Sequence, residues 1–236
     1  MARGMEFGGT RCGWPQALLF DLDGTLVDSV PDLASAVNRL LAAEGLDPLT
    51  RDAVRGMVGN GLRKLVERAF AARGQRLDAA GLDAMSARMT QVYGERLTEE
   101  TVLMAGAGET VAAYASAGVG LAVVTNKPEA LSRRILAHFG LDTAVPVVIG
   151  GDTCATRKPD PEMLHAACAA LGVPASRALM VGDSAADIDA ARAAGMACVA
   201  LRGGYTRRPV DELGADMVID GLAGLPQAIE RLKEPA

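Results

Sequence analysis

The sequence predicts an α/β protein, with a doubly wound, Rossmann-like parallel sheet and an inserted domain of helices. Three observations support this prediction. Short apolar runs with strand character alternate with helix-like stretches along most of the 236 residues. Residues 30–100 interrupt the alternation with several helical stretches and no convincing strand. Polar clusters directly follow several of the apolar runs, as ligand-binding residues do in open parallel sheets.

The expected strands are continuous apolar runs bounded by Gly, Pro or Asp. Runs of this kind are typical of strands that are buried on both faces, as in a parallel sheet. Half of all residues are hydrophobic, which is enough to form a sizeable core around such a sheet. The runs lie at residues 17–22, 119–124, 146–149, 178–181, 197–201 and 217–219.

Helix-like stretches separate these runs. Pro128 and Pro161 stand where a first helical turn would begin, and glycines such as Gly140 and Gly172 stand where helices would end. Alternating strands and helices predict a parallel sheet that is covered on both sides. The expected helices lie at residues 109–117, 128–139, 161–171, 185–194 and 222–232.

The helical block between the first expected strand and the rest of the chain indicates a second domain. We expect a catalytic core at 17–29 and 104–236, a helical cap domain at 30–103, and a loose N-terminal tail at 1–16. The cap helices are expected at residues 32–43, 51–57, 61–73 and 79–97.

Composition excludes several classes of function. The net charge of −5 and the aromatic content of 3% argue against a nucleic-acid partner. No apolar run approaches the ~18 residues that cross a bilayer, so no membrane partner is expected. The four cysteines form no C-x-x-C pair, which favours reduced thiols in a cytoplasmic protein.

Four polar clusters follow expected strands or lie in the loop beyond one: Asp21 with Asp23, the run 125–127, Lys158, and Asp183 with Asp187. Because the carboxyl ends of parallel strands meet at one edge of the sheet, these clusters are expected to form one site. Carboxylates are suitable ligands for Mg²⁺, and a lysine neutralises phosphoryl oxygens. A carboxylate can also act as a nucleophile, and a second one as general acid and base.

The same clusters resemble the motifs of a known family. Four segments, in order and spacing, are similar to the four motifs of the haloacid dehalogenase superfamily. Each cluster alone is also compatible with ordinary turns, solvated side chains or helix caps, and only the conjunction is specific. The segments are FDLDGTLVDS at 20–29, VVTNKP at 123–128, RKPDP at 157–161 and VGDSAADIDAA at 181–191.

The resemblance implies roles for the carboxylates. Asp21 is expected to be the nucleophile and Asp23 the general acid and base. Mg²⁺ is expected to be bound by Asp21, by Asp183 and by the backbone carbonyl of Asp23. Asp187 is expected to support the metal site and Lys158.

It also implies how the phosphoryl group is held. Thr125 and Asn126 are expected to bind it, together with Gly24 beside the nucleophile. Lys158 is expected to bridge nucleophile and phosphate. The inserted helices resemble the small helical cap of the superfamily, which closes over the site.

Within the superfamily, three longer stretches resemble the phosphoglycolate phosphatases. These stretches are FDLDGTLVDSVPDL at 20–33, VGNGLRKLVERA at 58–69 and GGYTRRPVDELGADMVID at 203–220. The likeness implies hydrolysis of 2-phosphoglycolate through an aspartyl-phosphate. The loop at Asn60, through its backbone N–H groups, with Arg63 or Lys64 nearby, is expected to bind the substrate carboxylate, although the Gly-Asn-Gly run is also compatible with a plain helix start.

Several alternatives stay open. Another small substrate, such as a sugar phosphate, a nucleotide or pyrophosphate, is compatible with the same site, and a non-catalytic phosphate- or partner-binding module belongs to a different class. A sugar-phosphate mutase is disfavoured because Leu33 stands where such caps usually have a histidine. A dehalogenase is disfavoured because it does not need Asp23. The chain is expected to be a monomer or a homodimer.

Overall fold

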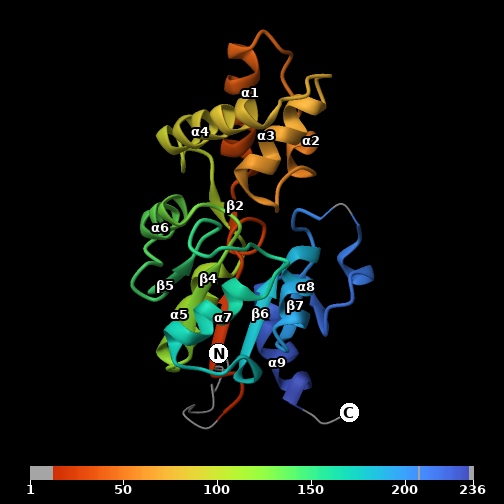
Figure 1. Cartoon of the computed structure of the whole chain (residues 1–236). Coiled ribbons are helices and arrows are strands. Elements are labelled where there is room, and N and C mark those ends of the chain that lie inside the picture. Colours follow the sequence, from red (N-terminus) through yellow and green to blue (C-terminus); the bar gives the residue numbers. More distant parts are fainter. Residues whose placement is uncertain (1–12, 207, 234–236) are drawn as a thin grey trace.

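A six-stranded parallel sheet forms the centre of the protein (Figure 1). The computed structural model describes residues 13–206 and 208–233. The strand order is β5-β4-β1-β6-β7-β8, and every neighbouring pair is parallel. The predicted α/β class is confirmed. The strands are β1 (Ala17–Phe20), β4 (Gly120–Val124), β5 (Val147–Ile149), β6 (Ala178–Gly182), β7 (Ala197–Leu201) and β8 (Met217–Ile219).

Helices cover both faces of this sheet. Alternate residues of β1 point to opposite faces, so that Leu18 and Phe20 join the apolar cluster of α5, α6 and α9, and Leu19 joins that of α7 and α8. Both faces are therefore buried, as the continuous apolar runs predict. The helices are α5 (Ala107–Ser116), α6 (Glu129–His138), α7 (Glu162–Leu171), α8 (Ala185–Ala193) and α9 (Leu225–Lys233), with 3₁₀ turns at Ala175–Arg177, Val210–Glu212 and Leu222–Gly224.

Four further helices, here called the cap helices, gather beyond one end of the sheet in Figure 1. Their apolar faces pack on one another and are continuous with the apolar cluster on the α5 face of the sheet. The domain boundaries at residues 30 and 103 stay a prediction. The cap helices are α1 (Val30–Ala43), α2 (Arg51–Arg55), α3 (Gly61–Ala71) and α4 (Ala79–Glu95).

A two-stranded antiparallel ladder, β2 (Val27–Asp28) with β3 (Val102–Leu103), joins the cap helices to the sheet. The sequence analysis did not predict these strands, because two residues are too few for a periodic pattern. Buried Asp32, in the first turn of α1, accepts hydrogen bonds from the backbone N–H groups of Glu100 and Thr101. The outgoing and returning chains are thereby fixed to each other.

The predicted N-terminal tail at 1–16 falls largely on residues 1–12, outside the described residues. Trp14, at its end, donates an indole hydrogen bond to the carbonyl of Ser176 and contacts the core. In the part of the chain that the structure describes, no helix combines the length and apolar character needed to cross a membrane.

Candidate active site

The predicted polar clusters meet at the carboxyl edge of the sheet. Asp21 follows β1, Thr125 follows β4, and Asp183 follows β6, and these three strands are neighbours in the sheet. All three side chains are buried, with 7%, 2% and 1% of their residue surface exposed. Parallel pairing of adjacent strands is what brings together residues that are far apart in the sequence.

Lys158 lies at the centre of this cluster. Its Nζ lies 3.0 Å from Asp21 Oδ1, 2.6 Å from Asp187 Oδ1 and 2.6 Å from the carbonyl oxygen of Val124. Two of these contacts are hydrogen bonds, to Asp187 and to the Val124 carbonyl, and the third is an ion pair with Asp21. Burial opposes its charge, but the neighbouring carboxylates outweigh burial and raise the pKa of Lys158. The lysine therefore stays cationic beside Asp21.

Asp187 anchors that lysine. Its Oδ2 accepts hydrogen bonds from the backbone N–H groups of Asp183 and Ser184 and from the Ser184 hydroxyl. Ser184 and Asp187 form a capping box at the start of α8. Both oxygens of Asp187 are thus occupied, one by Lys158 and one by the helix start. The structure places Asp187 where it orients other groups.

Asp183 is fixed from two sides. Its Oδ1 accepts a hydrogen bond from the Thr25 hydroxyl (3.1 Å), and its Oδ2 accepts one from the Tyr205 backbone N–H (2.6 Å). Gly24 permits this approach, because a Cβ atom there would lie 2.5 Å from Asp183 Oδ2 and its φ is +90°. Gly24, predicted to bind substrate, has this visible role in bringing the first and fourth motifs together.

A buried group of acidic oxygens at this edge fits a divalent cation. Ligand atoms of Asp21, Asp183 and Asp187 all lie within 4.8 Å of one another. Buried Asp21 Oδ1 contacts Lys158 but makes no hydrogen bond within the described residues. Asp187 Oδ2 accepts three hydrogen bonds and its Oδ1 pairs with Lys158, whereas each oxygen of Asp183 accepts only one. Asp21 and Asp183 therefore have the remaining capacity to bind a cation, and carboxylate oxygens are the donors that Mg²⁺ prefers.

The charges of the site also indicate a bound divalent cation. Burial raises the pKa of Asp21 to about 6, although Lys158 lowers it. Burial and the neighbouring carboxylates Asp187 and Asp21 raise the pKa of Asp183 well above its usual value. Four carboxylates at the edge, counting Asp23, face two ammonium groups, those of Lys158 and Lys127. The excess of two negative charges matches one divalent cation.

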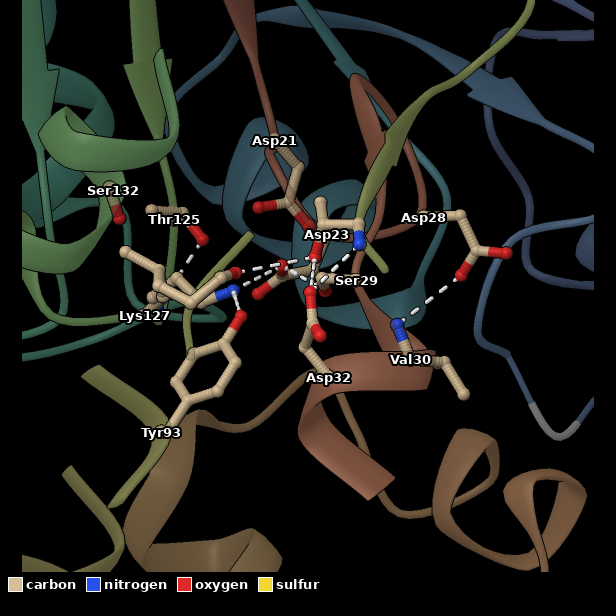
Figure 2. Close-up of polar contacts among 12 residues, drawn as sticks. Asp21, Asp23, Asp28, Ser29, Val30, Asp32, Tyr93, Thr125, Lys127 and Ser132 are labelled. Carbon is tan, nitrogen blue, oxygen red and sulfur yellow. Dashed lines mark hydrogen bonds and ion pairs between the residues drawn. The ribbon is translucent and has the colours of Figure 1, made fainter. Parts of the chain in front are cut away.

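Asp23 lies on the side of the site that faces the cap helices (Figure 2). Its Oδ1 accepts hydrogen bonds from Ser29 Oγ and Lys127 Nζ, both at 2.5 Å. Lys127 Nζ also donates to the hydroxyl of Tyr93 at 2.9 Å and lies 4.9 Å from the centre of its ring. Tyr93 comes from α4 and is completely buried. A cap helix therefore contacts the site through Lys127.

The site opens into a narrow pocket between the sheet edge and the cap helices, with a cavity volume of about 20 Å³. Asn126 Nδ2 donates to the carbonyl of Gly59 in the cap and to that of Lys158 in the core. Gly61, with φ +80°, approaches so closely that a Cβ there would lie 2.9 Å from the Asn126 carbonyl. The cap thus touches the core and narrows the pocket over the site.

Two predicted substrate-binding side chains lie outside this pocket. Arg63 forms an ion pair with Asp83 of α4, at 2.9 Å, and about half of its side chain is exposed. The side-chain oxygen of Asn60 accepts a hydrogen bond from Arg68, on the side of a neighbouring cleft. At the start of α3 the backbone of Gly59 and Gly61, and not these two polar side chains, lines the pocket.

Some residues of the site were missed by the sequence analysis. Lys127 was noted in its cluster but received no role, and Tyr93 gave no signal, because it is one aromatic residue in a long helix. Tyr205 lies in a stretch that carried the resemblance. Its hydroxyl donates to Asp28 (2.6 Å) and accepts from the Ser29 N–H (2.9 Å), which links the Asp183 loop to β2.

Comparison with known proteins points to one family. Residues 15–195 match the family of haloacid dehalogenase-like hydrolases. A phosphoglycolate phosphatase of Rhodospirillum rubrum is 46% identical over 215 residues, which cover 89% of each chain. The crystal structure of a predicted phosphoglycolate phosphatase from Haemophilus somnus superposes with a TM-score of 0.85 at 34% identity, covering 90% of this chain and 96% of that one. CbbY of Rhodobacter sphaeroides, in complex with phosphate, gives 0.78 at 28% identity, covering 91% and 99%.

Proposed function

Since the chain belongs to the haloacid dehalogenase-like hydrolases, we propose that it hydrolyses 2-phosphoglycolate to glycolate and phosphate. The observation that carries the proposal is the set of buried groups around Asp21: a lysine at 3.0 Å, a second carboxylate, Asp183, within 4.8 Å, and Asp23 two residues further along the chain. Relatives that are 46% and 45% identical are phosphoglycolate phosphatases, which supports 2-phosphoglycolate as the substrate.

In the first step Asp21 attacks phosphorus, and the bond from phosphorus to the ester oxygen breaks. Asp23 gives its proton to the leaving oxygen, which departs as the hydroxyl of glycolate. The Oδ1 atom of Asp23 is held by Ser29 and Lys127, and Oδ2 makes no hydrogen bond within the described residues, so Oδ2 is available to carry the proton. In the second step Asp23 takes a proton from water, which attacks the phosphorus of the aspartyl-phosphate and restores Asp21.

The other residues hold the reacting groups. Lys158 keeps its positive charge between the nucleophile and the phosphoryl oxygens. The Thr125 hydroxyl and the backbone N–H of Asn126, at the end of β4, line the pocket and are proposed to bind those oxygens, because both side-chain N–H donors of Asn126 bond the Gly59 and Lys158 carbonyls. Gly24 completes the turn after the nucleophile. Asp187 keeps Lys158 in place.

We propose Mg²⁺ as the cofactor, held by the side chains of Asp21 and Asp183 and the backbone carbonyl of Asp23. When bound, it supplies positive charge that neutralises the phosphoryl oxygens. The proposal is supported by the two uncompensated negative charges of the site and by the raised pKa values of Asp21 and Asp183. Substrate is the proposed partner, the proposed location is the cytoplasm, and the chain is proposed to act as a monomer or homodimer.

The pocket favours a small ester over a sugar phosphate. Apolar side chains from the cap fill the wall opposite the sheet edge, and a sugar ring would leave several hydroxyl groups there without partners. Leu33, which disfavours a mutase in the sequence, lines this wall, as do Val58, Leu62 and Leu65.

The test is replacement of the nucleophile. Asp21→Asn keeps the shape of the side chain and removes the attacking carboxylate. We expect magnesium-dependent release of phosphate from 2-phosphoglycolate to fall by at least about 10³-fold. Turnover retained within about tenfold of the wild type would contradict the mechanism. Aryl phosphate hydrolysed by the wild type when 2-phosphoglycolate is not would keep the mechanism and reject the substrate.

A further inference from the structure

We propose that Lys127 is a specificity-determining residue that binds the carboxylate of the substrate beside the leaving oxygen. The inference rests on the proposed function, since it assigns the second negative group of 2-phosphoglycolate to a residue of the same site. Lys127 is 3% exposed, lines the pocket, and comes from the loop after β4.

The charge of the pocket wall is the first argument. Among the described residues that line the pocket, Lys127 is the only cation. Arg63, the cation expected from the sequence, points away to Asp83. The rest of the wall is formed by apolar side chains, two glycines, two aspartates and two neutral polar residues. A carboxylate that enters such a pocket is costly without a partner, and Lys127 is the partner of opposite charge within the wall.

Distance is the second argument. Lys127 Nζ lies 2.5 Å from Asp23 Oδ1, and Asp23 must come within about 2.6–3.2 Å of the leaving oxygen to protonate it. In 2-phosphoglycolate a single CH₂ group separates that oxygen from the carboxylate carbon. When Asp23 reaches the leaving oxygen, the substrate carboxylate therefore lies close in space to the ammonium group of Lys127.

The third argument is that Lys127 has an N–H donor available for a ligand, whereas Lys158 is engaged with the catalytic carboxylates. Lys158 donates hydrogen bonds to Asp187 and to the Val124 carbonyl, and the nucleophile Asp21 lies 3.0 Å from it as an ion-pair partner. Lys127 has two partners within the described residues, Asp23 and the hydroxyl of Tyr93. One N–H donor remains for a ligand. The Tyr93 ring, 4.9 Å from Nζ, limits the positions that the ammonium group can take.

A narrower role for Lys127 is to position Asp23 alone. That role affects every phosphate ester equally, because every ester oxygen needs the same proton. Binding of the carboxylate instead affects only substrates that carry one. The two roles are separated by a pair of substrates that differ in this group: 2-phosphoglycolate and its neutral amide, 2-phosphoglycolamide.

The experiment measures kcat/KM for both substrates in the wild type and in Lys127→Gln, with saturating Mg²⁺. We expect the wild type to prefer the acid and the preference, as the ratio of the two kcat/KM values, to fall at least about tenfold in the variant. The same loss for both substrates would overturn the inference. Lys233→Gln, which removes an exposed lysine paired with Glu230 on α9, is the matched control and should keep the wild-type ratio.

Failure of the proposed function has a different signature. If wild-type protein hydrolyses neither substrate, the function is wrong; if it hydrolyses both equally, only the inference is wrong. If Lys127→Gln does not fold, a crystal structure of Asp21→Asn with 2-phosphoglycolate decides. A carboxylate oxygen within about 3.2 Å of Lys127 Nζ supports the inference. A carboxylate bound only by the backbone of Gly59 and Gly61 would overturn it.

Discussion

The carboxyl edge of the sheet and the cap helices face the same pocket but supply different kinds of groups. The sheet edge supplies ionisable side chains that are nearly all buried and bound to one another, such as Lys158 with Asp21 and Asp187. The cap supplies apolar side chains, backbone groups at Gly59 and Gly61, and one tyrosine hydroxyl. The reactive groups therefore come from the sheet edge, and the apolar wall of the pocket comes from the cap helices.

The first prediction tests this difference with two lysines. Lys158→Met should lower kcat/KM by at least about 10³-fold and reduce the free energy of unfolding by about 3–5 kcal/mol, because it leaves buried Asp21 and Asp187 without their cation. Lys64→Met, on α3, should change stability by less than about 1 kcal/mol, since its ion pair with Glu67 is half exposed. Phosphate release and urea unfolding measure both. Equal effects of the two substitutions would remove the distinction between the regions.

The second prediction concerns the acidic edge without metal. Burial raises the pKa of Asp21 to about 6, above its value of 3.8 in the unfolded chain. The native state then holds the proton of Asp21 more tightly, so the contribution of Asp21 to stability is greatest below pH 4 and decreases as the pH rises to about 6. In EDTA, wild-type protein should lose on the order of 1–3 kcal/mol between pH 4 and pH 7 relative to Asp21→Asn.

Urea unfolding at both pH values measures that difference, and added Mg²⁺ should restore the stability of the wild type at pH 7. Asp189→Asn is the control, since that carboxylate is half exposed and pairs with Arg192 on the surface. A wild type that is as stable as Asp21→Asn at pH 7 in EDTA would show that the site tolerates its negative charges without a cation.

Most of the sheet edge could be predicted from the sequence, and most of the cap contacts could not. The motifs at Asp21, Thr125 and Asp183 follow strands, and parallel pairing fixes where the end of each strand lies. The direction of Arg63 and the arrival of Tyr93 at Lys127 instead depend on how α3 and α4 rotate and pack. Hydrophobic periodicity gives the buried face of a helix but not the polar partner of one side chain on it.

The third prediction tests the contact between the two regions. Tyr93→Phe keeps the ring but removes the hydroxyl that accepts a hydrogen bond from Lys127. We expect a loss of about 1–2 kcal/mol in the free energy of unfolding, because a buried charged donor loses its acceptor. A double-mutant cycle with Lys127→Gln should give a coupling energy of at least about 0.5 kcal/mol. Additive effects would mean that the cap does not act on the site through this contact.

The fourth and smallest effect is expected on the outer face of the cap. Arg63→Ala removes an exposed ion pair with Asp83, so stability should change by less than about 1 kcal/mol and kcat/KM for 2-phosphoglycolate should stay within about twofold. Asn60→Ala should behave in the same way, because its oxygen accepts from Arg68 outside the pocket. A tenfold rise in KM for either variant would instead show that these side chains turn inward when substrate binds, as the sequence analysis predicts, and that the cap, like the sheet edge, supplies polar side chains to the substrate.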